Sequence, residues 1–134
     1  MLKFGGKRPQ NLGITDGGLH PCPDTPNCVC SAAPGPAHVA PLEFEGSAKD
    51  GLEKLAQVLS SMRGCEITAR EGNYLHAEFR TAWLGFIDDF EALFEEDQPR
   101  GRLEIRSASR MGHSDLGVNR KRIERIRTQF NRKP

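Results

Sequence analysis

The sequence lacks any long run of apolar residues. No stretch of the 134 residues approaches the roughly 18 consecutive apolar positions that a membrane helix needs. The first ten residues carry positive charge, but no apolar stretch of signal-peptide length follows them. We therefore expect no membrane span and, unless a leader has been removed, a cytoplasmic location.

Aromatic residues are few as well, and neither sign of charge dominates. Aromatics make up 7% and charged residues 28% of the chain, and the net charge is +1. This composition is typical of a soluble globular protein, and the length suits one domain. The balance hides an asymmetry, because range 88–97 holds six acids and no base, whereas 102–134 holds ten basic residues against three acids. The basic end is either a solvated face or a surface that steers an anionic ligand or nucleic acid.

The chain divides by composition into two parts. Residues 1–36 show little hydrophobic periodicity and are broken by glycine and proline, as in PCPDTPN and PGPA. We expect an irregular N-terminal arm with a cysteine loop there, followed by a single α+β domain over residues 37–134. The domain starts with a short strand around Leu42, which Pro41 places at a sheet edge.

Hydrophobic periodicity predicts the elements that follow. Ser47 and Asp50 have the spacing of a capping box and begin a helix predicted over 48–63. The apolar period then changes from 3.6 to 2, which predicts a hairpin around the turn EGN and two further strands. The further strands cover 85–95 and 102–109, and a basic helix follows. This β-α-β4-α order predicts a two-layer α+β sandwich with an antiparallel sheet, similar to the TATA-binding-protein-like and helix-grip folds.

The last predicted helix carries an asparagine in its apolar stripe. Ser114 suits the N-cap and Asp115 the first turn. A step of 100° per residue then places Asn119 toward the sheet, where a buried amide must be hydrogen-bonded. Either Asn119 ties the helix to the strand-to-helix corner, or it faces a polar pocket. The stripe consists of Leu116, Ile123, Ile126 and Phe130, with Arg120 and Arg127 on its flank.

The strand over 85–95 has a similar polar residue on its apolar face. Alternation places Asp88 with the phenylalanines and Asp89 on the opposite face, although a bulge near Gly85 would exchange them. Burial alone would raise the pKa of Asp88, whereas Arg106 or Arg110 as a partner would keep it charged.

These polar residues are expected to converge where the fourth strand meets the last helix, with Trp83 and His113 near the same end. The interpretation is either a polar end to an apolar ligand pocket or a satisfied polar cluster in an ordinary core. No cofactor is indicated. The predicted ligand-binding residues are Asp88, Asp89, Arg106, Ser107, Ser109, Arg110, Ser114, Asp115, Asn119 and Arg120.

The segment LHPCPDTPNCVCS places three cysteines beside His20. Paired C-x2-4-C knuckles of structural zinc sites are absent, so we predict no metal site. The alternatives are a Cys22–Cys28 disulfide, in an oxidising compartment, and free thiols. A nucleophilic Cys28 with a histidine base lacks any cysteine-hydrolase signature in its local sequence. Cys65 begins a strand on its apolar side and is expected to pack in the core.

The sequence indicates the function of the protein less directly than its fold. The leading hypothesis is a small-ligand-binding or interaction module, whose site at the 106–122 corner is covered by the cysteine loop and whose partner is a small molecule or a protein. One alternative is a hydrolase or isomerase with Asp88 as acid or base. The other is a nucleic-acid binder that uses the basic helix, but no strand offers the exposed aromatic and basic face that single-strand binders use.

Three segments together resemble the bacterial and plastid domain-of-unknown-function family 1499. They are LGITDGGLHPCPDTPNCVCS, LGFIDDFEALF and IRSASRMGHSDLGVNRKRIERI, and the resemblance covers about residues 11–131. The resemblance does not indicate which biochemical activity the protein has. Family members often carry a membrane or lipoprotein leader, which implies a related location. Cys30 departs from the serine more usual there. The matching positions are Cys22, Pro23, Pro26, Asn27, Cys28, Asp88, Asp89, Arg106, Ser107, Ser109, Arg110, Gly112, Ser114, Asp115, Gly117, Asn119, Arg120 and Arg122.

Overall fold

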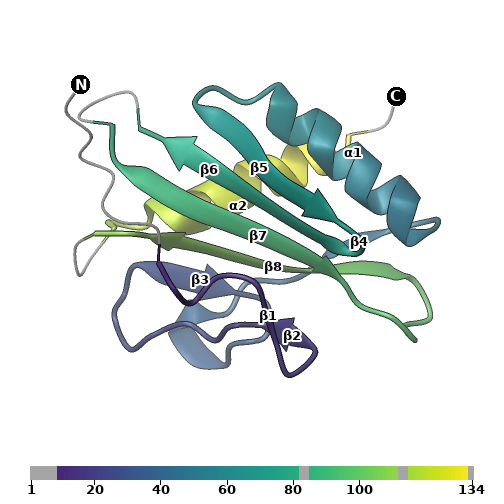
Figure 1. The fold of residues 1–134 in the computed structure, drawn as a ribbon, viewed down its shortest axis with the longest axis horizontal. Helices are drawn as coiled ribbons and strands as arrows, with labels where there is room; N and C mark the ends of the chain where they lie inside the picture. Colours follow the sequence, from purple (N-terminus) through teal and green to yellow (C-terminus); the bar gives the residue numbers. More distant parts are fainter. Residues whose placement is uncertain (1–8, 82–84, 112–114, 133–134) are drawn as a thin grey trace.

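The computed structural model describes residues 9–81, 85–111 and 115–132, and these form an α+β structure. Two helices cover one face of an antiparallel sheet (Figure 1). The strand order is β3-β8-β7-β6-β5, and β4 also pairs with β8. The strands are β3 (Cys28–Cys30), β4 (Leu42–Phe44), β5 (Cys65–Glu71), β6 (Tyr74–Arg80), β7 (Ile87–Phe94) and β8 (Gly101–Ser109).

From β4 onward, the predicted order of strand, helix, four strands and helix is the order found. The hairpin of β5 and β6 turns at Gly72 and Asn73, within the predicted EGN. Strand β4 lies at the sheet edge, as Pro41 predicts. The likeness to the TATA-binding-protein-like and helix-grip folds stays a prediction.

The N-terminal segment contains structure that the prediction of irregular chain did not include. Strands β1 (Ile14–Thr15) and β2 (Gly18–Leu19) form a small hairpin, and η1 (Gly35–Ala37) is a single 3-10 turn. Strand β3 joins the main sheet, where it pairs with residues 106–108 of β8 while β4 pairs with 101–103. Such short strands between prolines show too few alternations for a period to be recognised.

Helix α1 (Ala48–Ser60) begins at the predicted capping box. Ser47 Oγ accepts from the Asp50 amide, and Asp50 Oδ2 accepts from the Ser47 amide, both at 3.2 Å. The helix ends three residues before the predicted Arg63, where Ser61 Oγ donates to the Val58 carbonyl at 2.7 Å. Gly64 then leads into β5 with a φ of +76°, and a Cβ there would lie 2.4 Å from the Arg80 carbonyl oxygen, so both conformation and space require glycine.

Helix α2 (Val118–Phe130) starts later than predicted. Ser114 lies outside the described residues, and the N-cap is Gly117 with a φ of +79°. Leu116 was predicted in the buried stripe, but it precedes the helix, has a φ of +53° and is 86% exposed. The helical period cannot be extended across a turn, so this prediction was wrong. Asn119, Ile123, Ile126 and Phe130 are buried as predicted.

The sheet therefore has two faces of different chemistry. Its inner face, toward the helices, carries the apolar core, including Phe90, Leu103 and Ile105. Its outer face carries buried charged residues, and the β1–β2 hairpin lies near it. Within the described ranges, neither helix is long and apolar enough to cross a membrane.

Candidate functional site

A polar cluster lies between the inner face of the sheet and α2, centred on the fully buried Asn119. Ser107 Oγ donates to Asn119 Oδ1 at 2.6 Å. Asn119 Nδ2 donates to Ser109 Oγ at 2.9 Å and to Asp115 Oδ2 at 2.8 Å. Asn119 thus joins β8, the corner and α2, which is what a structural tie requires.

Asp88 completes this inner cluster through an arginine that was not predicted as its partner. Arg122 Nη1 lies 2.7 Å from Asp88 Oδ2 and donates to Asn119 Oδ1 at 2.9 Å. Arg106 and Arg110, the predicted partners, lie on the outer face because alternation along β8 separates them from Ser107 and Ser109. Asp88 is 3% exposed. An enclosed carboxylate paired with an arginine favours the core interpretation of this cluster over an acid or base open to substrate.

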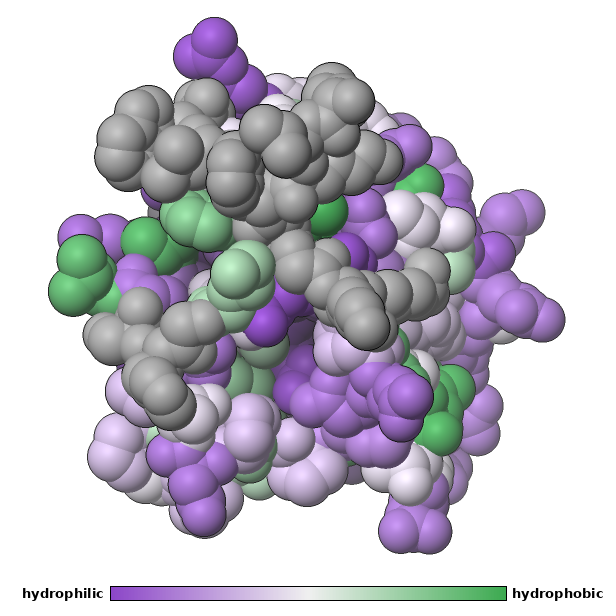
Figure 2. Space-filling model, turned by 60° about the vertical axis from the view of Figure 1, so that its left-hand side comes forward, coloured by the Kyte–Doolittle hydropathy of each residue, from purple (hydrophilic) through white to green (hydrophobic). Residues whose placement is uncertain are grey.

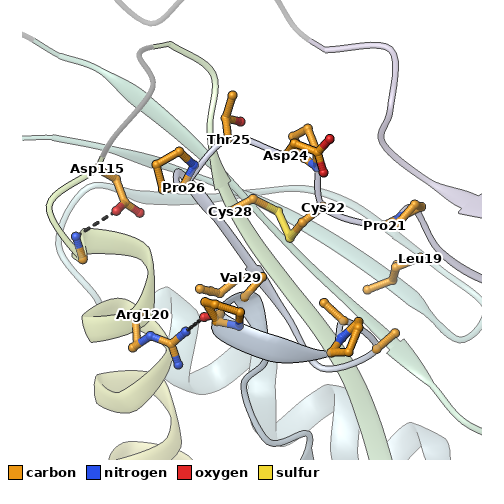
Figure 3. A pocket seen from close by; sticks show the side chains of 17 residues that line it. Leu19, Pro21, Cys22, Asp24, Thr25, Pro26, Cys28, Val29, Asp115 and Arg120 are labelled. Carbon is orange, nitrogen blue, oxygen red and sulfur yellow. Dashed lines mark hydrogen bonds between the residues drawn. A yellow bond between two sulfur atoms is a disulfide. The ribbon is translucent and has the colours of Figure 1, made fainter.

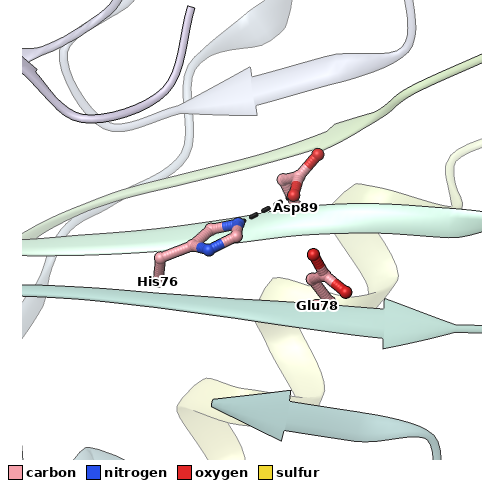
Figure 4. A group of neighbouring side chains, drawn as sticks. All are labelled: His76, Glu78 and Asp89. Atoms are coloured by element: carbon pink, nitrogen blue, oxygen red, sulfur yellow. Dashed lines mark hydrogen bonds and ion pairs between the residues drawn. The ribbon is translucent and has the colours of Figure 1, made fainter. Parts of the chain in front are cut away.

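The outer face holds a second buried network, around Asp89 (Figure 4). His76 Nε2 lies 2.7 Å from Asp89 Oδ1, and Arg110 donates to both oxygens of Asp89 at 2.8 and 2.9 Å. Arg110 also donates to Glu78 Oε2 at 2.7 Å. Burial raises the pKa of Asp89, but the hydrogen bonds from His76 and Arg110 outweigh burial and hold it below its ordinary value. The bond to Asp89 raises the pKa of Arg110.

His76, Glu78 and Asp89 offer ligand atoms within 4.8 Å of one another, a spacing that suits a metal ion (Figure 4). The guanidinium of Arg110 already binds both carboxylates, however, and neutralises the charge that would attract a cation. We interpret the trio as a structural ion network.

The N-terminal segment supplies backbone donors to other carboxylates of the outer face. The Gly13 amide donates to Glu91 Oε2 at 2.7 Å, and Tyr74 donates to the same oxygen. The backbone of Leu19 bonds to Glu104, whose pKa is nonetheless raised by burial and by Glu95 and Glu91. The segment therefore covers part of the sheet, and its amides replace the water that these acids would otherwise bind.

The cysteine loop and the start of α2 border an open cleft with a volume of about 820 Å³ (Figure 3). We call it the loop–helix cleft. Cys22 and Cys28 form a disulfide on its wall. Residues 32–34, 36 and 37 form another side, and the corner contributes the charged residues Asp115 and Arg120. The remaining lining residues are Leu19, Pro21, Pro23, Asp24, Thr25, Pro26, Val29 and Gly117.

Hydrogen bonds hold both sides of this cleft. Arg120 Nη1 donates to the His38 carbonyl at 2.9 Å and Nη2 to that of Pro36. Asn27 Nδ2 donates to the Ser109 carbonyl at 3.3 Å, and the Ser109 amide donates to the Asn27 carbonyl at 2.9 Å. The cysteine loop is thereby bonded to β8, and residues 36–38 are bonded to α2.

Asp115 organises the corner beside the cleft. Its Oδ1 accepts from the Gly117 amide at 2.8 Å, and its Oδ2 from the Asn119 amide at 3.1 Å. Burial raises the pKa of Asp115, but the hydrogen bonds from Asn119 and Gly117 outweigh it and lower the pKa overall. A charged Asp115 that accepts from amides without a partner inside the helix stabilises the start of α2.

The predicted site residues thus fall into three places. Asp88, Ser107, Ser109 and Asn119 form the inner cluster, Asp89, Arg106 and Arg110 lie on the outer face, and Asp115 and Arg120 border the cleft. Ser114, together with Trp83 and His113, lies outside the described residues.

Sequence reasoning missed His76, Glu78 and Glu91 on the outer face. Alternation along the second hairpin strand and the third strand places all three beside Asp89, and four polar residues on one sheet face would have signalled a covered polar network.

Two cysteines remain as thiols. Cys30 is buried, and burial raises the pKa of the half-buried Cys65 thiol to about 11, with a smaller lowering effect of Arg122. A thiol with so high a pKa is not an activated nucleophile at neutral pH. Cys22 and Cys28 are joined to each other and so offer no thiolate to a metal or a substrate.

Comparison with known proteins gives one assignment. Residues 18–130 match the family described as protein of unknown function (DUF1499), and no curated protein matches the chain. The matched range includes the cysteine loop, both aspartates of β7 and the strand-to-helix corner. Because the match covers most of its length, the chain belongs to the DUF1499 family.

Proposed function

We propose that this protein is a binding domain that holds a largely apolar small molecule in the loop–helix cleft. The observation that carries the proposal is the lining of the cleft, in which prolines, alanines, Leu19 and Val29 are combined with few charged groups. Ligand sites usually have this composition, and the volume of about 820 Å³ lies within their usual range of roughly 300 to 1,000 Å³.

The fixed walls of the cleft support the same proposal. The disulfide limits the conformations of the cysteine loop, and Arg120 holds the 36–38 segment against α2. A preformed cleft loses little conformational entropy when a ligand enters. Of the predicted site residues, Asp115 and Arg120 line the cleft and are the ones that we propose contact such a ligand. The inner cluster supports the corner from behind.

The disulfide also bears on location. Disulfides persist in oxidising compartments and are rare in the cytosol. We therefore propose that the protein works in an oxidising compartment, in place of the cytoplasmic location expected from the sequence. Titration of the purified, unfolded protein with a thiol reagent should find two reactive thiols before reduction and four after it.

The binding proposal is tested with Nile red, a neutral dye that fluoresces in apolar surroundings. We expect saturable binding to the native protein, and replacement of the half-buried cleft residue Ala33 by tryptophan should weaken it at least about tenfold by filling the space.

The matched control is Ala40→Trp, an exposed position nearby that does not line the cleft. It should bind the dye like the unmodified protein. Equal binding by the Ala33 variant, or no saturable binding by the native protein, would contradict the proposal.

A further inference from the structure

A second hollow lies at the end of the molecule where β6 ends and α2 begins. It has a volume of about 850 Å³ and lies between the connection from α1 to β5 (residues 61–64), the end of β6 and α2. We call it the arginine groove, because Arg63, Arg80, Arg122 and Arg125 line it. Figure 2 brings the left-hand end of Figure 1 forward, and most of the coloured surface that it shows is hydrophilic. We propose that this groove binds a small organic anion, with a carboxylate or phosphate on its arginines and an apolar tail along its floor.

The charges of the groove are the first support. Its described lining contains no aspartate or glutamate. Arg63, Arg80 and Arg125 form no ion pair within the described part of the chain, whereas Arg70, Arg100 and Arg127 each pair with an acid elsewhere. Unpaired cations gathered around one hollow repel one another, and an anion placed among them would reduce that repulsion.

The second support is the fixed position of Arg122. Its Nη1 is held by Asp88 Oδ2 and Asn119 Oδ1, and its guanidinium lies 4.7 Å from the centre of the Phe79 ring. Among the described residues, the polar contacts of Arg122 all use Nη1, and neither Nε nor Nη2 forms a hydrogen bond. The side chain is 11% exposed and lines the groove. The inner cluster thus presents an ordered arginine with free donors, which suits the planar geometry of a carboxylate or phosphate.

The apolar floor narrows the class of ligand. Met62 and Val118 line the groove beside the arginines, and Val118 is 37% exposed. Phe79 also lines it but is 5% exposed and lies beneath the Arg122 guanidinium. A bare inorganic ion would leave this surface in water, whereas an alkyl or aryl tail would cover it. One ordered arginine beside an apolar floor fits a single anionic head better than a long polyanion.

This site is separate from the loop–helix cleft, with which it shares no lining residue. The two proposals can therefore fail independently. The Ala33→Trp variant should keep its affinity for an organic anion, and variants of the arginine groove should keep their affinity for Nile red.

The test uses octyl phosphate below its micelle concentration, titrated by calorimetry at low salt. We expect saturable binding at one site, at least about tenfold tighter than that of inorganic phosphate or octanol, and weaker at high salt. The double variant Arg63→Gln with Arg125→Gln should lose at least about tenfold in affinity. Both arginines are exposed, so the thermal melting temperature should be little changed.

A matched double variant, Lys49→Gln with Lys121→Gln, removes the same charge from exposed positions outside the groove and should bind like the unmodified protein. Equal losses in the two double variants would show a general charge effect and overturn the proposal. Equal affinity for octanol and octyl phosphate would show that only apolar contact is made and would overturn the anion site. Binding to phosphatidylglycerol vesicles without binding of octyl phosphate would also overturn it, in favour of a surface that binds membranes.

Discussion

Replacement of Asn119 by leucine is expected to lower the free energy of unfolding by about 3 kcal/mol. Leucine has a similar volume, but it removes the acceptor that serves Ser107 and Arg122 and the donors that serve Ser109 and Asp115. Polar groups buried without a partner lose their hydration and gain nothing in return.

The measurement is equilibrium unfolding in urea, with Lys121→Leu as control. Lys121 is exposed on the same helix, so its replacement should change stability by no more than about 0.5 kcal/mol. Unchanged stability of the Asn119 variant, combined with lost binding of octyl phosphate, would instead make Asn119 a residue that serves the ligand and not the fold.

The same variant connects the core to the arginine groove. Arg122 is held by Asp88 and Asn119 together, so the loss of Asn119 removes one of its two fixed contacts. The asparagine in the helix stripe therefore has a consequence beyond stability: it sets the direction in which an arginine faces the groove.

Much of the fold follows from local pattern. The capping box of Ser47 and Asp50 fixed the start of α1, and alternation placed Asp88 and Asp89 on opposite faces of β7. Alternation also brought Ser107 and Ser109 to the side where Asn119 lies. These results depend only on the period of a helix or strand, which neighbouring residues determine.

Most of the features that the sequence did not predict depend on contacts between segments that are distant along the chain. Arg122 and Asp88 meet only after α2 packs on the sheet, and no spacing in the sequence reveals this. Strand β3 is stabilised by pairing with β8, about 78 residues away along the chain, and its own sequence is too short to show a period. The prediction that Leu116 lies in the buried stripe was wrong because its positive φ interrupts the helical periodicity before α2 begins.

Replacement of Arg110 by methionine is expected to lower the free energy of unfolding by about 3 to 5 kcal/mol at neutral pH. Arg110 is 6% exposed at its side chain and pairs with Asp89, which is 1% exposed, and with Glu78. Methionine fills a similar volume but leaves the Asp89 charge buried with His76 as its remaining partner. Urea unfolding at several pH values measures this loss.

The stabilisation by Asp89 depends on pH. The pKa of Asp89 is lowered in the folded protein, so its stabilisation is present above the ordinary aspartate pKa of about 3.9 and is lost as the pH falls through the lower folded value. Without Arg110 the hydrogen bonds and the positive charge that it supplies no longer lower the pKa of Asp89, so this pKa rises. The deficit of the variant should therefore be full near neutral pH and shrink in acid.

Two further variants decide whether the network on the outer face is structural. Arg100→Met removes an exposed arginine paired with Glu45 and should cost no more than about 0.5 kcal/mol. Adding Asp89→Asn to the Arg110 variant removes the stranded charge and should restore part of the lost stability, because a neutral amide is less costly to bury than a carboxylate. A deficit that did not change with pH and was not reduced by Asp89→Asn would show that Arg110 acts through packing alone.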